Sequence, residues 1–102
     1  MGKTLNINVP HDKIAVFCKL NHIRKLSLFG SVLREDFRPD SDVDVLVEFE
    51  EGHVPGLLRF IGMKNELSVI IAHEVDLRTP AELSRYFRDE VVSSAQVEYV
   101  ER

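Results

Sequence analysis

Three aspartates of this sequence have the chemistry and the spacing to bind cations. Asp42 and Asp44 stand two apart in a predicted strand over residues 42–49, so both carboxylates emerge from one face with α-carbons roughly 6.5–7 Å apart. Two like charges at this spacing repel, and a cation between them is the simplest compensation. Mg²⁺ takes one or two carboxylates and completes its shell with water and phosphate oxygens, which suits this pair.

A third carboxylate, Asp76, lies in a predicted strand over residues 74–78, on the face opposite Val75 and Leu77. If the two strands are neighbours, Asp76 joins the same cluster and three acids can hold two ions. Two metals about 3.5–4 Å apart can bind a triphosphate, lower the pKa of an acceptor hydroxyl and stabilise the entering and leaving oxygens. Asp76 then acts as the base, or orients the metal that serves instead of one.

Gly30 and Ser31 form a candidate phosphate-binding turn, because a buried strand over residues 23–29 is predicted to end at the glycine. Glycine lets the backbone approach phosphate closely, and the serine hydroxyl with the first helical N–H groups can hold the β- and γ-phosphates. Arg34, one helical turn after Ser31, is expected on the same side, where it pairs with the phosphates or the departing pyrophosphate.

The spacing of these residues is specific. A Gly–Ser pair separated by ten intervening residues from Asp–x–Asp has a chance expectation on the order of one in a thousand for a chain of this length. The structural alternative is that Gly30 ends a strand, Ser31 caps a helix and the aspartates flank a solvated turn. We disfavour it because a strand that begins with two acids on one face is poor for folding alone.

Hydrophobic periodicity predicts the elements that position these residues. In the strand over residues 42–49 the two faces alternate strictly, with valines on the core face, Asp42 and Asp44 on the other. The predicted order is helix 12–21, strand 23–29, short helix 31–36, turn 37–41, strand 42–49, helix 57–71, strand 74–78, a helix starting at the capping box Thr79–Pro80–Ala81–Glu82, and a final amphipathic helical segment 90–100. This order predicts one α/β or α+β domain over residues 1–102, with a small sheet covered by helices.

Composition excludes several classes of function. The chain has 102 residues and a formal charge of −4, so we expect no direct binding of nucleic acid through a general positive field. No apolar run is long enough for a signal peptide or a membrane span, which favours a cytoplasmic location. The single cysteine, Cys18, lies in an apolar helical pattern and is expected to be buried. A domain this small gains stability from a partner or a second copy, so homo- or hetero-oligomers are compatible with it.

The remaining polar residues are assigned ordinary roles. The four histidines, His11, His22, His53 and His73, are scattered without metal-ligand spacing and are expected at the surface or at helix ends. Arg78 is expected to pair with an acidic neighbour; the alternative is that it contacts the nucleotide. An exposed aromatic face on the last helices would be a partner surface.

The segment from Leu28 to Phe49, which contains Gly30, Ser31, Arg34, Asp42 and Asp44, resembles the signature of the polymerase-beta-like nucleotidyltransferases in their minimal (MNT) branch. Val75–Asp76–Leu77 resembles the stretch that carries the third carboxylate of that family. Glu35 departs from the family tendency to place a small residue after the arginine, which leaves the local turn in question.

The resemblance implies a nucleotidyltransferase fold with a mixed sheet and the site at its edge, Mg²⁺ dependence with two ions, and ATP as donor. It also implies a cognate HEPN-domain ribonuclease toxin as partner: proteins like this one act as its antitoxin by adding AMP to a tyrosine hydroxyl. Two alternatives stay open. One is a stoichiometric binding module without catalysis, and the other is a small-molecule nucleotidyltransferase whose acceptor pocket a second chain completes.

Overall fold

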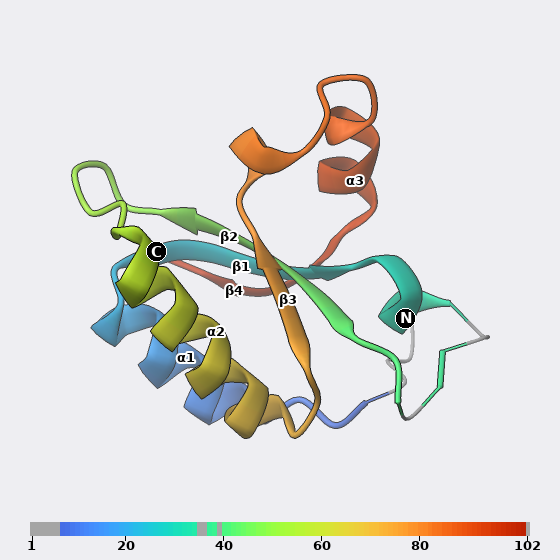
Figure 1. Ribbon diagram of the computed structural model, residues 1–102, viewed down its shortest axis with the longest axis horizontal. Coiled ribbons are helices and arrows are strands. Elements are labelled where there is room, and N and C mark those ends of the chain that lie inside the picture. Colours follow the sequence, from blue (N-terminus) through green and yellow to red (C-terminus); the bar gives the residue numbers. More distant parts are fainter. Residues whose placement is uncertain (1–6, 35–36, 39, 102) are drawn as a thin grey trace.

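The computed structural model describes residues 7–34, 37–38 and 40–101. It is a mixed α/β structure in which helices cover a four-stranded sheet (Figure 1). The elements are α1 (His11–Leu20), β1 (Ile23–Phe29), the 3₁₀ helix η1 (Gly30–Leu33), β2 (Val43–Phe49), α2 (Leu57–Ile71), β3 (Val75–Arg78), the 3₁₀ helix η2 (Pro80–Glu82), α3 (Arg88–Ser94) and β4 (Gln96–Val100). The predictions for α1, β1, β2, α2 and β3 are confirmed within two residues at each end.

The sheet has the strand order β3-β2-β1-β4. β1 is antiparallel to both β2 and β4, whereas β2 and β3 run parallel. A parallel pair needs a crossover, and α2 supplies it. The sheet is therefore mixed, as the family resemblance implied.

One face of the sheet packs against α1 and α2, which lie together on that side (Figure 1). Val43, Val45 and Val47 of β2 are fully buried, as the alternation predicted. They share one core with apolar residues of both helices and of β1, among them Ile14, Phe17, Leu26, Leu28, Met63 and Leu67. The alternate residues of β2 face the other side, so the chemistry of Asp44 is separated from the core by the sheet itself.

The end of the chain differs from the prediction. The capping box is present, with both Thr79 and Glu82 in place, but it opens a single 3₁₀ turn, η2, and not a full helix. The segment 90–100 was expected to be helical throughout; instead α3 ends at Ser94 and residues 96–100 form β4 on the free edge of β1. An edge strand is stabilised by a partner far away in the sequence, which helical periodicity does not register.

Cys18 is fully buried, as predicted, and burial raises the pKa of its thiol to about 12. A thiol in this state is a packing group and a poor nucleophile. Among the described residues, no helix combines the length and the apolar character needed to cross a membrane.

Candidate active site

The turn after β1 brings the chain backbone against Asp44. Phe29, the last residue of β1, pairs with Asp44 on β2. Gly30 follows with φ of 72°, a left-handed conformation, and a Cβ at this position would overlap with Asp44 Oδ2 and lie 3.2 Å from Asp44 Cγ. Glycine is therefore required twice at this turn, for its backbone conformation and for the close approach of the carboxylate.

Ser31 ties the turn to the start of β2. Its backbone N–H donates a hydrogen bond to the carboxylate of Asp44, and its hydroxyl donates to the backbone oxygen of Asp42 at 3.3 Å. The four-residue helix η1 begins here and ends at Leu33, because Arg34 adopts an extended conformation with φ of −106° and ψ of 156°. The predicted short helix over 31–36 is thus shorter than expected, and its last two residues, Glu35 and Asp36, lie outside the described residues.

The parallel pairing of β2 and β3 places Asp76 directly beside Asp44. Neighbouring strands lie about 4.8 Å apart, and paired residues of a parallel ladder point to the same face. Two hydrogen bonds set this register: the N–H of Val43 donates to the Glu74 oxygen at 2.8 Å, and the N–H of Val75 donates to Ser68 Oγ at 3.0 Å. Ser68 belongs to α2, so the crossover helix itself positions the third carboxylate.

Asp42 and Arg34 flank the paired aspartates. Asp42 is exposed and immediately precedes β2, and its charge contributes to the electrostatics of Asp44. Arg34 is exposed and follows η1, with its backbone N–H donating to the Ser31 oxygen at 3.0 Å. The structure therefore gathers Gly30, Ser31, Asp42, Asp44 and Asp76 at one end of β2, with Arg34 three residues from Ser31.

The local electrostatics are unfavourable for a carboxylate at position 44. Burial and the neighbouring charge of Asp76 raise the pKa of Asp44, and the charge of Asp42 adds to this. The Ser31 N–H and the guanidinium of Arg78 act in the opposite direction, but the pKa stays raised. Arg78 also pairs with Asp76, at 3.3 Å between Nε and Oδ2, which confirms the prediction of an acidic neighbour.

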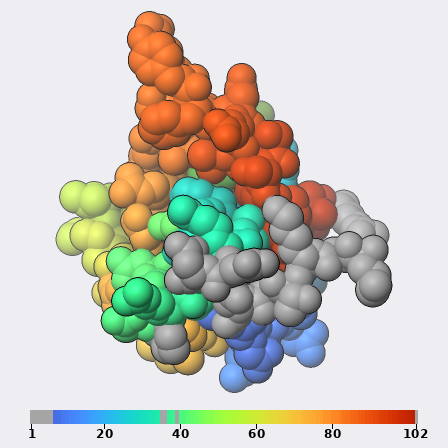
Figure 2. Space-filling view, turned by 90° about the vertical axis from the view of Figure 1, so that its right-hand side faces the viewer, coloured from blue at the N-terminus to red at the C-terminus, as the bar shows by residue number. Residues whose placement is uncertain are grey.

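The donor set of this cluster suits a hard divalent cation. All three side chains offer carboxylate oxygens, which Mg²⁺ prefers. Burial and the charge of Asp76 raise the pKa of Asp44, so a bound cation would favour the ionised form. The ligand atoms of the three aspartates do not all lie within 4.8 Å of one another, so their side chains must turn for all three to hold one ion. Figure 2 shows this end of the molecule, where η1 and the residues leading into β2 form a surface in teal and green beneath the orange and red projection of residues 80–94.

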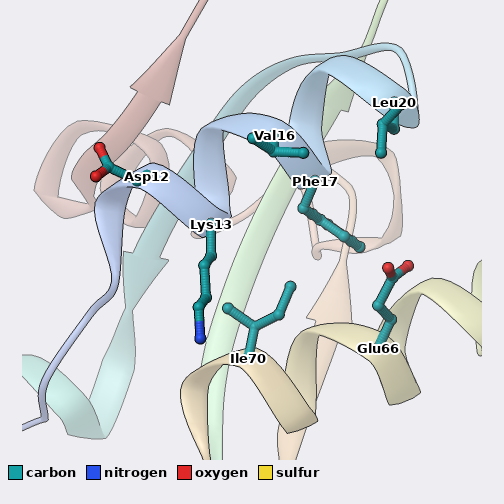
Figure 3. Close-up of a pocket in the computed structure, with 7 residues that line it drawn as sticks. All are labelled: Asp12, Lys13, Val16, Phe17, Leu20, Glu66 and Ile70. Atoms are coloured by element: carbon teal, nitrogen blue, oxygen red, sulfur yellow. The ribbon is translucent and has the colours of Figure 1, made fainter.

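A second surface feature lies on the helical side of the molecule. An apolar groove runs between α1 and α2, with Val16, Phe17, Leu20 and Ile70 on its walls and Lys13 and Glu66 at its rim (Figure 3). Because these helices cover the valine face of the sheet, the groove is separated from the aspartates by the core. A molecule that reaches Asp44 and Asp76 must therefore approach the opposite face.

The predicted surface positions of His22 and His53 are confirmed, but the prediction that the histidines are scattered is wrong for these two, which meet in space. His22 and His53 stack with ring centroids 3.9 Å apart, and Glu50 lies beside them. The sequence does contain a signal: His22 immediately precedes β1, and Glu50 and His53 follow β2. An antiparallel pairing of these strands brings the two ends together, which linear spacing does not reveal.

Comparison with known proteins identifies the family. A family model for the nucleotidyltransferase domain matches residues 12–100. A candidate protein adenylyltransferase of Methanocaldococcus jannaschii is 33% identical over 91 residues, which are 89% of this chain and 96% of the relative. The protein adenylyltransferase MntA of Thermococcus cleftensis is 44% identical over 55 residues, which are 54% of each chain.

Three solved structures share the fold. A candidate minimal nucleotidyltransferase, 32% identical, superposes with a TM-score of 0.69 over 83% of this chain and 85% of the other. A toxin–antitoxin structure with AMP-PNP, 19% identical, gives 0.72 over 92% and 76%. A tri-AMPylated Shewanella oneidensis HEPN toxin in complex with an MNT antitoxin, also 19% identical, gives 0.64 over 89% and 70%. The chain belongs to the nucleotidyltransferase domain family, in its minimal branch.

Proposed function

We propose that this protein transfers AMP from ATP to a hydroxyl of a partner protein, a tyrosine of a HEPN-domain toxin, and acts as the antitoxin of that partner. The observation that carries the proposal is the register that sets Asp44 beside Asp76, next to the Gly30–Ser31 turn. The relatives named as protein adenylyltransferases support a protein acceptor. The solved toxin complexes, one with AMP-PNP and one with an AMPylated HEPN toxin, support the donor and the partner.

In this proposal the turn after β1 binds the donor. The hydroxyl of Ser31 and the guanidinium of Arg34 contact the β- and γ-phosphates. Gly30, which has no Cβ, lets the Asp44 carboxylate lie directly against this turn. Asp42, Asp44 and Asp76 would hold two Mg²⁺ ions. Bound there, the ions would neutralise the triphosphate and stabilise both the entering and the leaving oxygen.

The reaction is a single displacement at the α-phosphorus. The acceptor oxygen forms a bond to that phosphorus, the bond to the bridging oxygen breaks, and pyrophosphate leaves with the electron pair. Asp76 accepts the proton of the acceptor hydroxyl. Its side chain is 40% exposed, so an incoming side chain can reach it.

The acceptor must approach from the face that carries the projection of residues 80–94. Tyr86 and Phe87, in the segment between η2 and α3, are 85% and 51% exposed, and large exposed aromatic side chains are typical of protein interfaces. We propose that this projection meets the toxin and guides its tyrosine to Asp76. We propose a cytoplasmic location for this reaction, because the ribonuclease toxin that the family resemblance implies would act on cellular RNA.

The test is the transfer of radioactive label to the purified partner, a HEPN-domain toxin to be sought in the neighbouring reading frames. Label at the α-phosphate of ATP is expected on the toxin in the presence of Mg²⁺, whereas label at the γ-phosphate is not. Protection of cells from the toxin by Asp42→Asn/Asp44→Asn at the same molar ratio as wild type would instead show stoichiometric inhibition. Label on a small molecule in place of the toxin would also contradict the proposal.

Arg78→Gln is expected to move the acidic limb of the pH–rate profile to higher pH. The guanidinium lowers the pKa of Asp44, so its loss raises this already raised pKa further, and the ionised carboxylate that binds metal forms at higher pH. The rate at alkaline pH should change less than the rate at acidic pH. Initial rates of AMP transfer against pH measure this, with Arg24→Gln as control because Arg24 pairs with Glu48 at 2.7 Å. An acidic limb at the wild-type position would contradict the assigned role of Arg78.

A further inference from the structure

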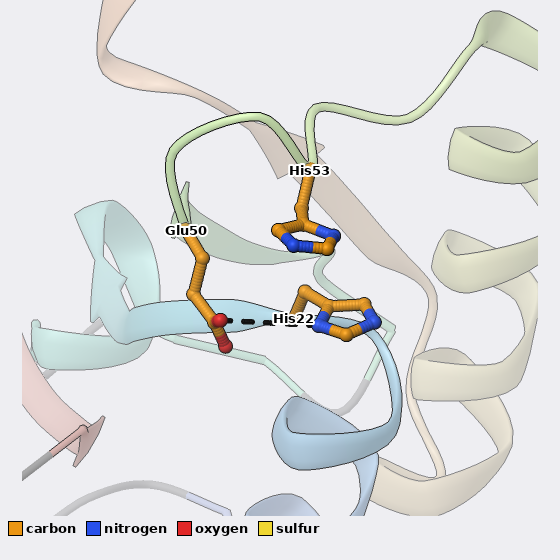
Figure 4. Close-up of side chains that lie close together, drawn as sticks. All are labelled: His22, Glu50 and His53. Atoms are coloured by element: carbon orange, nitrogen blue, oxygen red, sulfur yellow. Dashed lines mark ion pairs between the residues drawn. The ribbon is translucent and has the colours of Figure 1, made fainter.

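Two histidines and a glutamate converge at the end of the sheet away from the aspartates. His22 lies between α1 and β1, and Glu50 and His53 lie in the loop between β2 and α2 (Figure 4). One ligand atom from each of the three side chains lies within 4.8 Å of the other two. Nδ1 of His22 is 3.8 Å from Oε1 of Glu50, and their side chains are 48% and 32% exposed, so a solvent ion can reach them.

The backbone holds the three residues together. The N–H of Glu50 donates to the His22 oxygen at 2.9 Å, and the N–H of His53 donates to the Glu50 oxygen at 3.0 Å. Gly52 closes this turn with φ of 80°, a conformation that glycine adopts at little cost. The three side chains therefore start from backbone positions that hydrogen bonds have already fixed, which lowers the ordering cost of binding.

The donor set differs from that of the aspartate cluster. Two imidazoles with one carboxylate are a common ligand set for zinc, which leaves a fourth position for water. Around one tetrahedral zinc ion, donor atoms lie roughly 3.3 Å apart, since its bonds to nitrogen and oxygen are about 2.0–2.2 Å long. The rings of His22 and His53 are stacked at an interplanar angle of 17°, so they must turn out of this parallel arrangement for both to direct a nitrogen at one ion. Both side chains are exposed, which leaves room for this rotation.

The histidine cluster is also separate in space from the aspartates. Glu50 follows Asp44 by six residues, roughly 20 Å along an extended strand. At the other end of the same hairpin, His22 precedes Ile23, which pairs with Phe49. The cluster is therefore independent of the proposed nucleotide site, and its test needs no measurement of AMP transfer.

We propose that His22, Glu50 and His53 form a binding site for a divalent transition-metal ion, with zinc as the ion that fits the ligands best. Imidazole nitrogen favours zinc, copper or nickel over magnesium, so the two sites of this protein would select different metals. A bound ion would join the α1–β1 turn to the β2–α2 loop. It would thereby stabilise the folded state, because the separated ligands of the unfolded chain bind it poorly.

The experiment is zinc titration of the tag-free, metal-stripped protein by calorimetry, with His22→Asn and His53→Gln. Asparagine suits position 22 because the backbone there has φ of 56°, which asparagine tolerates. Wild type is expected to bind one zinc ion per chain at this site and to melt at a higher temperature with zinc. Each variant is expected to bind it at least about tenfold more weakly, since even indirect ligand contacts are worth 10- to 100-fold in affinity.

Two control variants locate the ion. His11→Gln removes an exposed histidine outside the cluster, whose Nδ1 lies 3.0 Å from Glu98. This pair has one imidazole where the proposed zinc site has two, so the variant should bind zinc like wild type. Asp42→Asn/Asp44→Asn should also keep zinc binding. Zinc should shift the ring-proton NMR signals of His22 and His53 in the unaltered protein, a readout that does not depend on any variant folding. No zinc uptake, uptake unchanged in both cluster variants, or uptake lost in either control would overturn the proposal.

Discussion

Asp44→Asn is expected to reduce AMP transfer at least about a thousandfold. Metal-assisted charge stabilisation supplies several kcal/mol at the transition state, and each 1.36 kcal/mol is a factor of ten in rate. Asparagine keeps an oxygen that can accept the Ser31 N–H, so the change removes the charge of the metal ligand and preserves its main hydrogen bond. Initial rates of α-phosphate label transfer, with saturating Mg²⁺ and toxin, measure the loss.

The same substitution is expected to stabilise the metal-free protein. The folded-state pKa of Asp44 is raised above its value in the unfolded chain, so the stability linked to its protonated form is present at low pH and lost as pH rises through the folded pKa. At neutral pH the carboxylate therefore opposes folding. Removing a partly exposed like-charge contact is worth about 0.5 kcal/mol, or roughly 2–4 °C in melting temperature for a domain of this size.

The difference in melting temperature between Asp44→Asn and wild type should depend on both Mg²⁺ and pH, whereas a general stabilising effect of the substitution would depend on neither. Below the pKa of the unfolded chain wild type is neutral at this position, so the gain in Asp44→Asn should disappear. With EDTA at neutral pH the variant should melt above wild type, and saturating Mg²⁺ should narrow or reverse the difference because wild type binds the ion better. Glu66→Gln removes an exposed carboxylate from α2, on the face of the sheet opposite the aspartates; it is the control and should leave both transfer and melting close to wild type. If Asp44→Asn transferred AMP at the wild-type rate, the assignment of Asp44 as a metal ligand would be wrong.

Gly30→Ala is expected to destabilise the protein and to inactivate it. A left-handed conformation costs a residue with a Cβ about 1–2 kcal/mol, and overpacking adds about 1–3 kcal/mol. Both costs apply here, because φ is 72° and the added methyl group would overlap with Asp44 Oδ2. A destabilisation of about 3 kcal/mol is expected from urea unfolding. Displacement of the carboxylate by about 1 Å should reduce transfer at least about a hundredfold.

Gly52→Ala separates the cost of the left-handed backbone conformation from the cost of overpacking. Gly52 has a similar φ of 80°, but no heavy atom lies within 4 Å of the Cβ position. This variant should lose only the conformational part, about 1–2 kcal/mol, and should keep its rate of transfer. Equal effects of the two substitutions on stability and on rate would show that contact with Asp44 at Gly30 has no consequence.

Local sequence determined most of the elements. The apolar periodicity of α1 and α2 and the alternation in β2 depend on residues close together in the chain, so the sequence predicted their extents and the buried valine face. The Gly30–Ser31 turn, Asp42 and Asp44 also belong to one continuous segment. Their types and spacing were therefore sufficient to predict where they lie relative to one another.

Tertiary structure decided what depends on strand pairing. The sequence left open whether Asp76 joins the other acids, and the parallel register of β2 and β3 settled its position beside Asp44. Residues 96–100 form β4 because β1 offers them a free edge, although their spacing also fits a helix. The histidine cluster likewise arises from the antiparallel pairing of β1 and β2. In each case the deciding contact joins residues far apart in the chain, and the spacing of nearby residues carries no information about it.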